Sequence, residues 1–75
     1  MKILITDGLA KDAIAALQEF AEVDEHFYEP DALGEALKGY DAVIIRSATQ
    51  IRQAQIDIAK TGQLKLIVRA GVGID

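Results

Sequence analysis

The fold is decided by the stretch Asp41-Ala42-Val43-Ile44-Ile45-Arg46-Ser47-Ala48-Thr49. Four apolar residues in a row, three of them β-branched, are typical of a strand buried on both faces, as in a parallel sheet. The apolar run stops at Arg46, and small and hydroxyl-bearing residues follow it. Since ligands of open α/β sheets bind at the carboxyl ends of the strands, Arg46 is either a ligand-binding group or a surface cation that ends the strand.

Similar apolar runs alternate with helical patterns along the whole chain. Strands are predicted at 2–6, 21–28, 42–45 and 64–68, and helices at 11–20, 30–39 and 53–60. The order βαβαβαβ predicts an α/β fold, a flavodoxin-like parallel sheet with right-handed crossovers and strand order 2-1-3-4. A complete sheet of this kind has a fifth strand and a closing helix. We therefore expect a chain truncated before the fifth strand, with its fourth strand left as an apolar edge.

The spacing of apolar residues predicts which side of each helix is buried. The first helix is expected to bury Ala13, Ile14, Ala16, Leu17 and Phe20, the second Leu33, Ala36, Leu37 and Tyr40, and the third Ile51, Ala54, Ile56 and Ile58. The second strand alternates loosely between acids, which is the pattern of a charged edge strand.

Length and composition limit the classes of function. The chain has 75 residues, 51% hydrophobic and 27% charged, which suits one small folded domain. Its net charge of −4 disfavours a nucleic acid or an acidic membrane as partner. There is no cysteine, so disulfides and thiolate metal sites are excluded and a reducing cytoplasm fits. No apolar run approaches the roughly 18 residues of a membrane span, and no metal site is predicted.

Two stretches could bind an anion. The first, 46–49, combines a guanidinium with backbone N–H groups and hydroxyls, which suits a carboxylate or a phosphate. The alternative is a surface arginine paired with an acid, with Thr49 capping a helix. The second stretch, Arg69-Ala70-Gly71-Val72-Gly73, repeats this arrangement one strand over, although a lone Gly-x-Gly is also a common tight turn. Two neighbouring strands that both end in arginine would direct two cations into one crevice.

Other polar residues have simpler interpretations. Asp7, before Gly8, could be an acid in a phosphoacceptor pocket, but a turn is favoured. His26 is interpreted as a solvated edge residue, and Tyr28 and Tyr40 as rim or core packing. No Ser/His/Asp set, paired-carboxylate site or phosphate-binding loop with lysine is present in the sequence, so we predict no catalytic and no cofactor-binding residue in this chain.

The whole chain resembles the amino-terminal part of the D-isomer-specific 2-hydroxyacid dehydrogenases, and within them the phosphoglycerate dehydrogenase branch. The resemblance is carried by 2–7, 45–49 and 69–75, in the family's order and spacing. It implies a partial substrate-binding domain at 1–75, with the family's Rossmann domain absent. Arg46, helped by Ser47, would hold the phosphate or carboxylate of a small anionic substrate. The backbone of Ala70, Gly71, Val72 and Gly73 would receive the carboxylate, and Arg69 would add positive field.

The resemblance also implies an activity for the longer protein. That protein would be an NAD-dependent oxidoreductase converting 3-phosphoglycerate to 3-phosphohydroxypyruvate in serine synthesis, while the 75 residues alone would bind no NAD and be inactive. The sister branch acting on 4-phosphoerythronate is the nearest rival. A receiver-like domain is a second alternative, but Arg46 stands where its phosphoacceptor aspartate would be. A third is a self-associating module, a homodimer or domain swap through the open edge of the fourth strand.

Overall fold

The computed structural model describes residues 1–70 as a parallel sheet with strand order β2-β1-β3-β4. Its strands are β1 (Lys2–Ile5), β2 (Glu22–Glu25), β3 (Ala42–Ile45) and β4 (Leu66–Arg69). Its helices are α1 (Lys11–Gln18), α2 (Pro30–Leu37) and α3 (Gln53–Ala59). The predicted α/β fold, element order and strand order are confirmed. The predictions for Gly71, Val72 and Gly73 lie outside the described residues.

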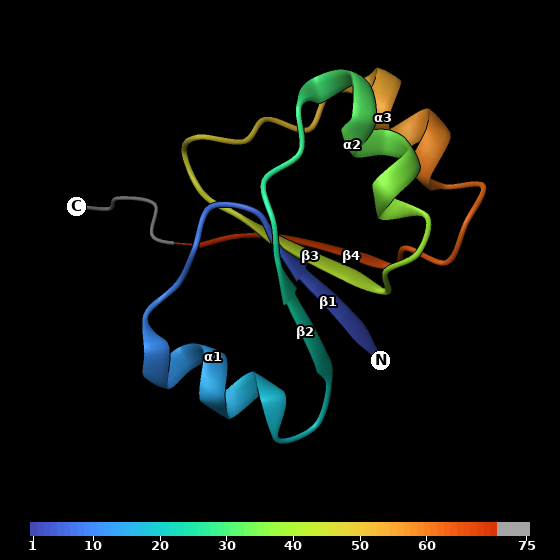
Figure 1. The fold of residues 1–75 in the computed structure, drawn as a ribbon. Helices are drawn as coiled ribbons and strands as arrows, with labels where there is room; N and C mark the ends of the chain where they lie inside the picture. The colour runs from blue at the N-terminus through green and yellow to red at the C-terminus, as the bar shows by residue number, and fades with distance from the viewer. Residues whose placement is uncertain (71–75) are drawn as a thin grey trace.

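Alternate residues of the central strands supply two separate cores. Leu4, Val43 and Ile45 pack on one face against residues of α2 and α3, and Leu4 and Val43 are completely buried. Ile3, Ile5 and Ala42 pack on the other face against α1. Figure 1 shows α1 on one side of the sheet and the pair α2 and α3 on the other. The buried-strand prediction for 42–45 is therefore correct, because both faces of β3 are covered.

The helix α1 is buried less than its sequence predicts. Ile14 and Leu17 are half-buried, while Ala13 and Ala16 are exposed. Phe20 lies beyond the end of the helix and is 66% exposed, so its predicted burial is wrong. A single short helix covers this face, and the chain turns back toward β2 before Phe20 can reach the sheet.

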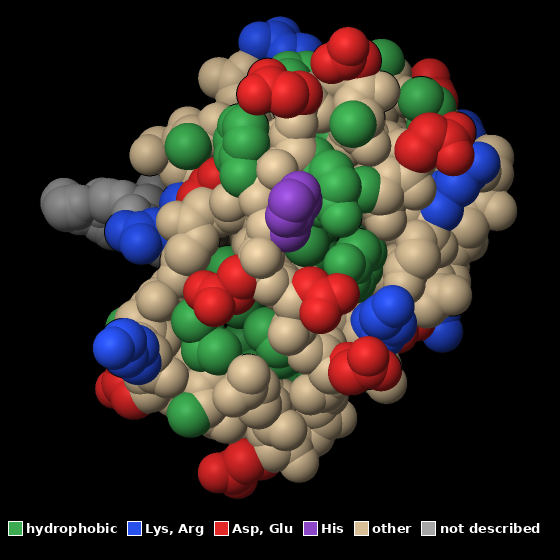
Figure 2. All heavy atoms as spheres, viewed as in Figure 1, with side chains coloured by type: hydrophobic (Ala, Val, Ile, Leu, Met, Phe, Trp, Pro, Cys, Tyr) green, Lys and Arg blue, Asp and Glu red, His purple; other side chains and the backbone are tan. Residues whose placement is uncertain are grey.

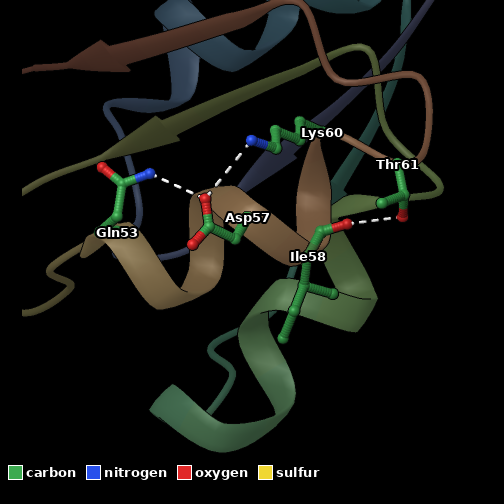
Figure 3. Close-up of polar contacts among 5 residues, drawn as sticks. All are labelled: Gln53, Asp57, Ile58, Lys60 and Thr61. Carbon is green, nitrogen blue, oxygen red and sulfur yellow. Dashed lines mark hydrogen bonds and ion pairs between the residues drawn. The ribbon is translucent and has the colours of Figure 1, made fainter.

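The helix α3 is rotated relative to its predicted buried face. Gln55 and Ala59 are buried instead of Ala54, and Ile56 is half-buried as predicted. Ile58 is 38% exposed and packs against α2 rather than against the sheet. Figure 3 shows the Ile58 side chain pointing toward α2. A Cβ placed on Gly34 of α2 would lie 3.0 Å from the Ile58 Cβ, so this glycine permits the close approach of the two helices.

The two edges of the sheet differ in chemistry. Glu22, Asp24 and Glu25 of β2 are exposed acids, as predicted. Figure 2 shows the single histidine at the surface, with acidic side chains spread over the same face. The strand β4 is an apolar edge, also as predicted: Leu66, Ile67 and Val68 are 55%, 40% and 37% exposed. It begins later than predicted, because the Lys65 and Leu66 N–H groups both donate to the Asp41 carbonyl at the start of the ladder.

The described helices are short. Among residues 1–70, none has the length and apolar character needed to traverse a bilayer.

Candidate functional site

The carboxyl end of β1 organises the carboxyl end of β3. The Asp7 carboxylate accepts hydrogen bonds from the backbone N–H groups of Arg46 (2.7 Å) and Thr49 (3.1 Å) and from the Thr49 hydroxyl (2.6 Å). Gly8 has a φ of 82°, a conformation that glycine adopts easily, and it turns the chain away from the sheet. The turn prediction for Asp7 and Gly8 describes the backbone, but it misses the hydrogen bonds between the Asp7 carboxylate and the loop that follows β3.

These bonds fix the shape of residues Arg46–Thr49, which we call the Arg46 loop. Thr49 is buried, whereas Arg46, Ser47 and Ala48 are exposed. The alternative in which Thr49 caps a helix is wrong, because the N-cap of α3 is Arg52. Asp7 uses the N–H groups of Arg46 and Thr49, so the loop offers an anion the Arg46 guanidinium, the Ser47 hydroxyl and the N–H groups between them.

The end of β4 lies beside this loop. Ile45 is the register partner of Arg69, and the Ala70 N–H donates to the Ile45 carbonyl at 2.8 Å. Arg46 and Arg69 are therefore at the same edge of the sheet, one register position apart. Within residues 1–70 neither arginine forms an ion pair with an acid. The structure thus brings Arg46, Ser47, Arg69 and Ala70 to one edge.

Two hollows open at this edge, on the side covered by α2 and α3. The larger hollow has a volume of about 460 Å³ and contains Arg69, Arg52 and Thr49; its full lining is Ile45, Thr49, Gln50, Ile51, Arg52, Ile56, Ile67 and Arg69. The smaller hollow, of about 270 Å³, is lined by Pro30, Ser47, Ala48, Gln50, Arg52 and Gln55. No acidic residue lines either hollow, so both suit an anion. The sequence interpretation missed Arg52, which lines both.

The smaller hollow is held open by a bridge between two helices. Gln55 is buried, accepts the Arg52 backbone N–H at 2.8 Å and donates to the Pro30 carbonyl at 3.1 Å. The bridge ties the start of α3 to the start of α2. Because the side-chain oxygen and the side-chain nitrogen of this buried glutamine both have backbone partners, they fix the position of the two helix starts relative to each other.

Comparisons with known proteins agree with this architecture. Residues 3–75 match the family described as D-isomer specific 2-hydroxyacid dehydrogenase, catalytic domain. The chain is 39% identical to D-3-phosphoglycerate dehydrogenase 2, chloroplastic, of Arabidopsis thaliana over 99% of its length, and 41% identical to D-3-phosphoglycerate dehydrogenase of Methanocaldococcus jannaschii over 100%. It is also 34% identical to a hydroxypyruvate reductase of Thermotoga maritima over 99% of its length.

A solved structure shows the same fold. NAD⁺-bound 3-phosphoglycerate dehydrogenase of Entamoeba histolytica superposes on all of this chain with a TM-score of 0.71 and 30% identity. The chain spans 27% of that protein, 24% of the Thermotoga relative, and 12% and 14% of the plant and archaeal relatives. From the match over residues 3–75, together with the shared fold, we conclude that the chain belongs to the D-isomer-specific 2-hydroxyacid dehydrogenase family.

Proposed function

We propose that these 75 residues supply the substrate-binding part of an NAD-dependent D-3-phosphoglycerate dehydrogenase. Such an enzyme oxidises 3-phosphoglycerate to 3-phosphohydroxypyruvate, a step of serine synthesis. The names of the plant, archaeal and Entamoeba relatives support this substrate, and the hydroxypyruvate reductase relative supports a related 2-hydroxyacid. A cytoplasmic location is part of the proposal and is supported by the absence of cysteine.

The observation that carries the proposal is the Arg46 loop, fixed by Asp7 at the carboxyl edge of the sheet. A fixed loop lets the Arg46 guanidinium and the Ser47 hydroxyl meet an anionic group without first being ordered. Arg69 adds positive charge at the same edge. The proposed contact between the substrate carboxylate and the backbone of 70–73 lies largely outside the described residues.

The oxidation breaks the C2–H bond, passes a hydride to NAD⁺ and gives the hydroxyl proton to a base. The sequence has no complete dinucleotide fingerprint and no Arg-Glu-His set, so both partners of that step would come from residues outside these 75. What this chain does is bind and orient the substrate. We therefore propose a partial substrate-binding domain that needs a Rossmann domain for activity and is inactive alone.

The test is calorimetric titration of the protein with D-3-phosphoglycerate. We expect binding that Arg46→Gln weakens by at least about tenfold, because a charged hydrogen bond to the ligand is lost. Lys65→Gln removes the same charge from an exposed residue before β4 and should leave the dissociation constant unchanged. Equal binding by the unchanged protein and Arg46→Gln would contradict the role of Arg46. Tighter binding of 4-phosphoerythronate would assign the sister activity instead.

A second proposal rests on the exposed apolar strand β4. An edge strand with unpaired backbone groups can pair with a second copy of the chain, giving a homodimer or a domain swap. We expect light scattering over a dilution series to show a dimer, and Leu66→Lys to dissociate it by placing a charge on the edge. A folded monomer at every concentration would contradict this proposal.

A further inference from the structure

The two outer strands of the sheet carry opposite charges. The charged residues of β2 are Glu22, Asp24 and Glu25, and all three are exposed acids. At the other edge, Lys65 lies just before β4 and Arg69 ends it, and both are exposed. None of these five residues forms an ion pair in the part of the chain that the structure describes. The sheet therefore has one acidic edge and one basic edge.

Both edges also present backbone groups that the sheet does not use. Among the described residues β2 pairs only with β1, and β4 only with β3 (Figure 1). Successive N–H groups of a strand point to opposite sides. The His26 N–H donates to β1, so the Glu25 N–H points away from the sheet. The Leu66 N–H is directed toward β3, so the Ile67 N–H likewise points outward. Each edge can therefore receive one more strand.

The apolar side chains of β4 lie where a single copy of the chain leaves them uncovered. Leu66 and Val68 are the register partners of Ala42 and Ile44, which pack on the α1 side of the sheet. The cluster on that side ends at β3, and Leu66 and Val68 are 55% and 37% exposed. A second β2 added to β4 in the same direction brings its own α1 to this side. Phe20, which is 66% exposed and precedes β2 by two residues, comes with it.

The opposite side of β4 presents a groove that suits the acids of β2. This groove, of about 210 Å³, lies between α3 and β4 and is lined by apolar residues and two lysines, Lys60 and Lys65, without any acid. Lys60 pairs with Asp57 of its own helix at 3.5 Å (Figure 3), which leaves Lys65 for a partner. Asp24 is the register partner of Leu4, whose side chain packs toward α2 and α3. In a sheet continued from β4 to a second β2, Asp24 therefore lies on the side of the groove.

Charge disfavours the pairing of two like edges. Two copies of β4 related by a two-fold axis run antiparallel, and a register centred on Ile67 places Lys65 of one copy opposite Arg69 of the other. Two copies of β2 bring their acids together in the same way. Like charges opposite each other destabilise a strand pair, whereas opposite charges stabilise it. The favourable combination is the basic edge with the acidic edge.

We propose that β4 binds the β2 edge of a second copy of this chain, in parallel and head to tail. The inference rests on the proposed self-association for the use of β4, and it names the surface that β4 binds. Registers that keep the two faces of the sheet continuous place either Lys65 beside Glu22 or Arg69 beside Asp24. A head-to-tail contact leaves one β2 and one β4 free, so the assembly grows beyond a dimer as the protein concentration rises.

The test uses two variants, each with one edge blocked by proline. Ile67→Pro removes an outward N–H from β4 and Glu25→Pro removes one from β2, and both keep the hydrogen bonds inside the sheet. We expect each variant alone to be monomeric in light scattering at every concentration, because every copy then lacks one half of the contact. An equimolar mixture should form a heterodimer that grows no further, through the intact β4 of one variant and the intact β2 of the other.

The other outcomes overturn the inference in distinguishable ways. A dimer of Glu25→Pro alone would show that β4 pairs with β4, so the proposed self-association would survive and this inference would fail. A dimer of Ile67→Pro alone, or a mixture that stays monomeric, would also overturn it. A monomer of the unchanged protein at every concentration would overturn both. The titration with D-3-phosphoglycerate tests the proposed substrate separately from all of these results.

A second pair of variants leaves the backbone unchanged and decides the matter if circular dichroism shows that a proline variant is unfolded. Lys65→Glu and Glu22→Lys should each raise the dissociation constant of the assembly about fivefold, because each places like charges at the contact. Mixing the two should restore association, since an acidic β4 then meets a basic β2. Association that is equal in both variants and in the unchanged protein would contradict the pairing of the two edges.

Discussion

The helices that cover the two faces of the sheet are buried to very different degrees. On the α2–α3 face, four large side chains are essentially removed from solvent: Leu4, Leu33, Leu37 and Val43. On the α1 face the strand residues Ile3 and Ile5 are also buried, but no residue of the covering helix is, and Phe20 is 66% exposed. Both hollows and the buried Thr49 lie on the α2–α3 side. The candidate site is thus built on the well-packed side, where the surroundings hold a loop in place.

The largest expected effect concerns one leucine from each covering layer, Leu37 of α2 and Leu17 of α1. Leu37→Ala should lower the free energy of unfolding by about 2–5 kcal/mol, because Leu37 is fully buried and its removal leaves a cavity. Leu17→Ala should cost about 1 kcal/mol, since Leu17 is only half-buried and the site can fill with water. Urea unfolding of both variants checks the difference. Equal losses would mean that the two faces contribute alike.

The next effect tests how firmly the α2–α3 side holds the Arg46 loop. Asp7→Asn should cost about 1.5–3 kcal/mol, because an amide can accept fewer hydrogen bonds than a carboxylate and its NH₂ group faces N–H donors. Hydrogen exchange of the Arg46 and Thr49 amides should accelerate more than that of β1. The matched control is Asp12→Asn, at an exposed aspartate in the first turn of α1. It should lower the free energy of unfolding by only a few tenths of a kcal/mol. Unaltered exchange at Arg46 would show that Asp7 does not hold the loop.

A smaller effect comes from Tyr40, the polar anchor of the α2–α3 core. Burial, with the hydrogen bond to Asp24 at 2.7 Å, raises the pKa of Tyr40 well above its usual value. A raised pKa stabilises the fold below the unfolded-state pKa of about 10, and this stability is lost as the pH rises above it. Tyr40→Phe should lower the free energy of unfolding by about 1 kcal/mol at neutral pH. In this variant the free energy of unfolding should also fall less steeply as the pH rises above about 10. An alkaline unfolding curve with the same slope in both proteins would rule this out.

The smallest effect is expected on the thinly covered face. Phe20→Ser should change the free energy of unfolding by less than about 0.5 kcal/mol, because the ring is mostly in solvent already. Thermal unfolding followed by circular dichroism measures this. A loss above 2 kcal/mol would show that Phe20 is buried in solution, and would restore the predicted stripe of α1.

Much of the fold could be predicted because its signals are local. The apolar run at 42–45 is long enough for a strand and too short for a helix, and it ends at a charged residue. Pro30 and the spacing of Leu33 and Leu37 define α2 and its buried side correctly. For α3 the same reasoning predicted that Ala54 and Ile58 are buried, whereas Gln55 and Ala59 are. Several apolar residues lie around this helix of seven residues, so their spacing does not define one buried side. The contact between Ile58 and Gly34 of α2 sets which side of α3 faces the sheet.

The chain's own sequence therefore determined the strands, the helices, the parallel order and the candidate cations at the carboxyl edge. The strands, helices and cations follow from periodicity and charge, because these depend on residues within a few positions of one another. The parallel order follows from the alternation of strands and helices, because crossovers of this kind are right-handed and join parallel strands. Only the tertiary structure decided that Asp7 holds the Arg46 loop, since those hydrogen bonds join residues 39 and 42 positions apart. It also decided that Arg52 shares a hollow with Arg69, because side chains from a loop and a neighbouring strand meet only after the sheet has formed.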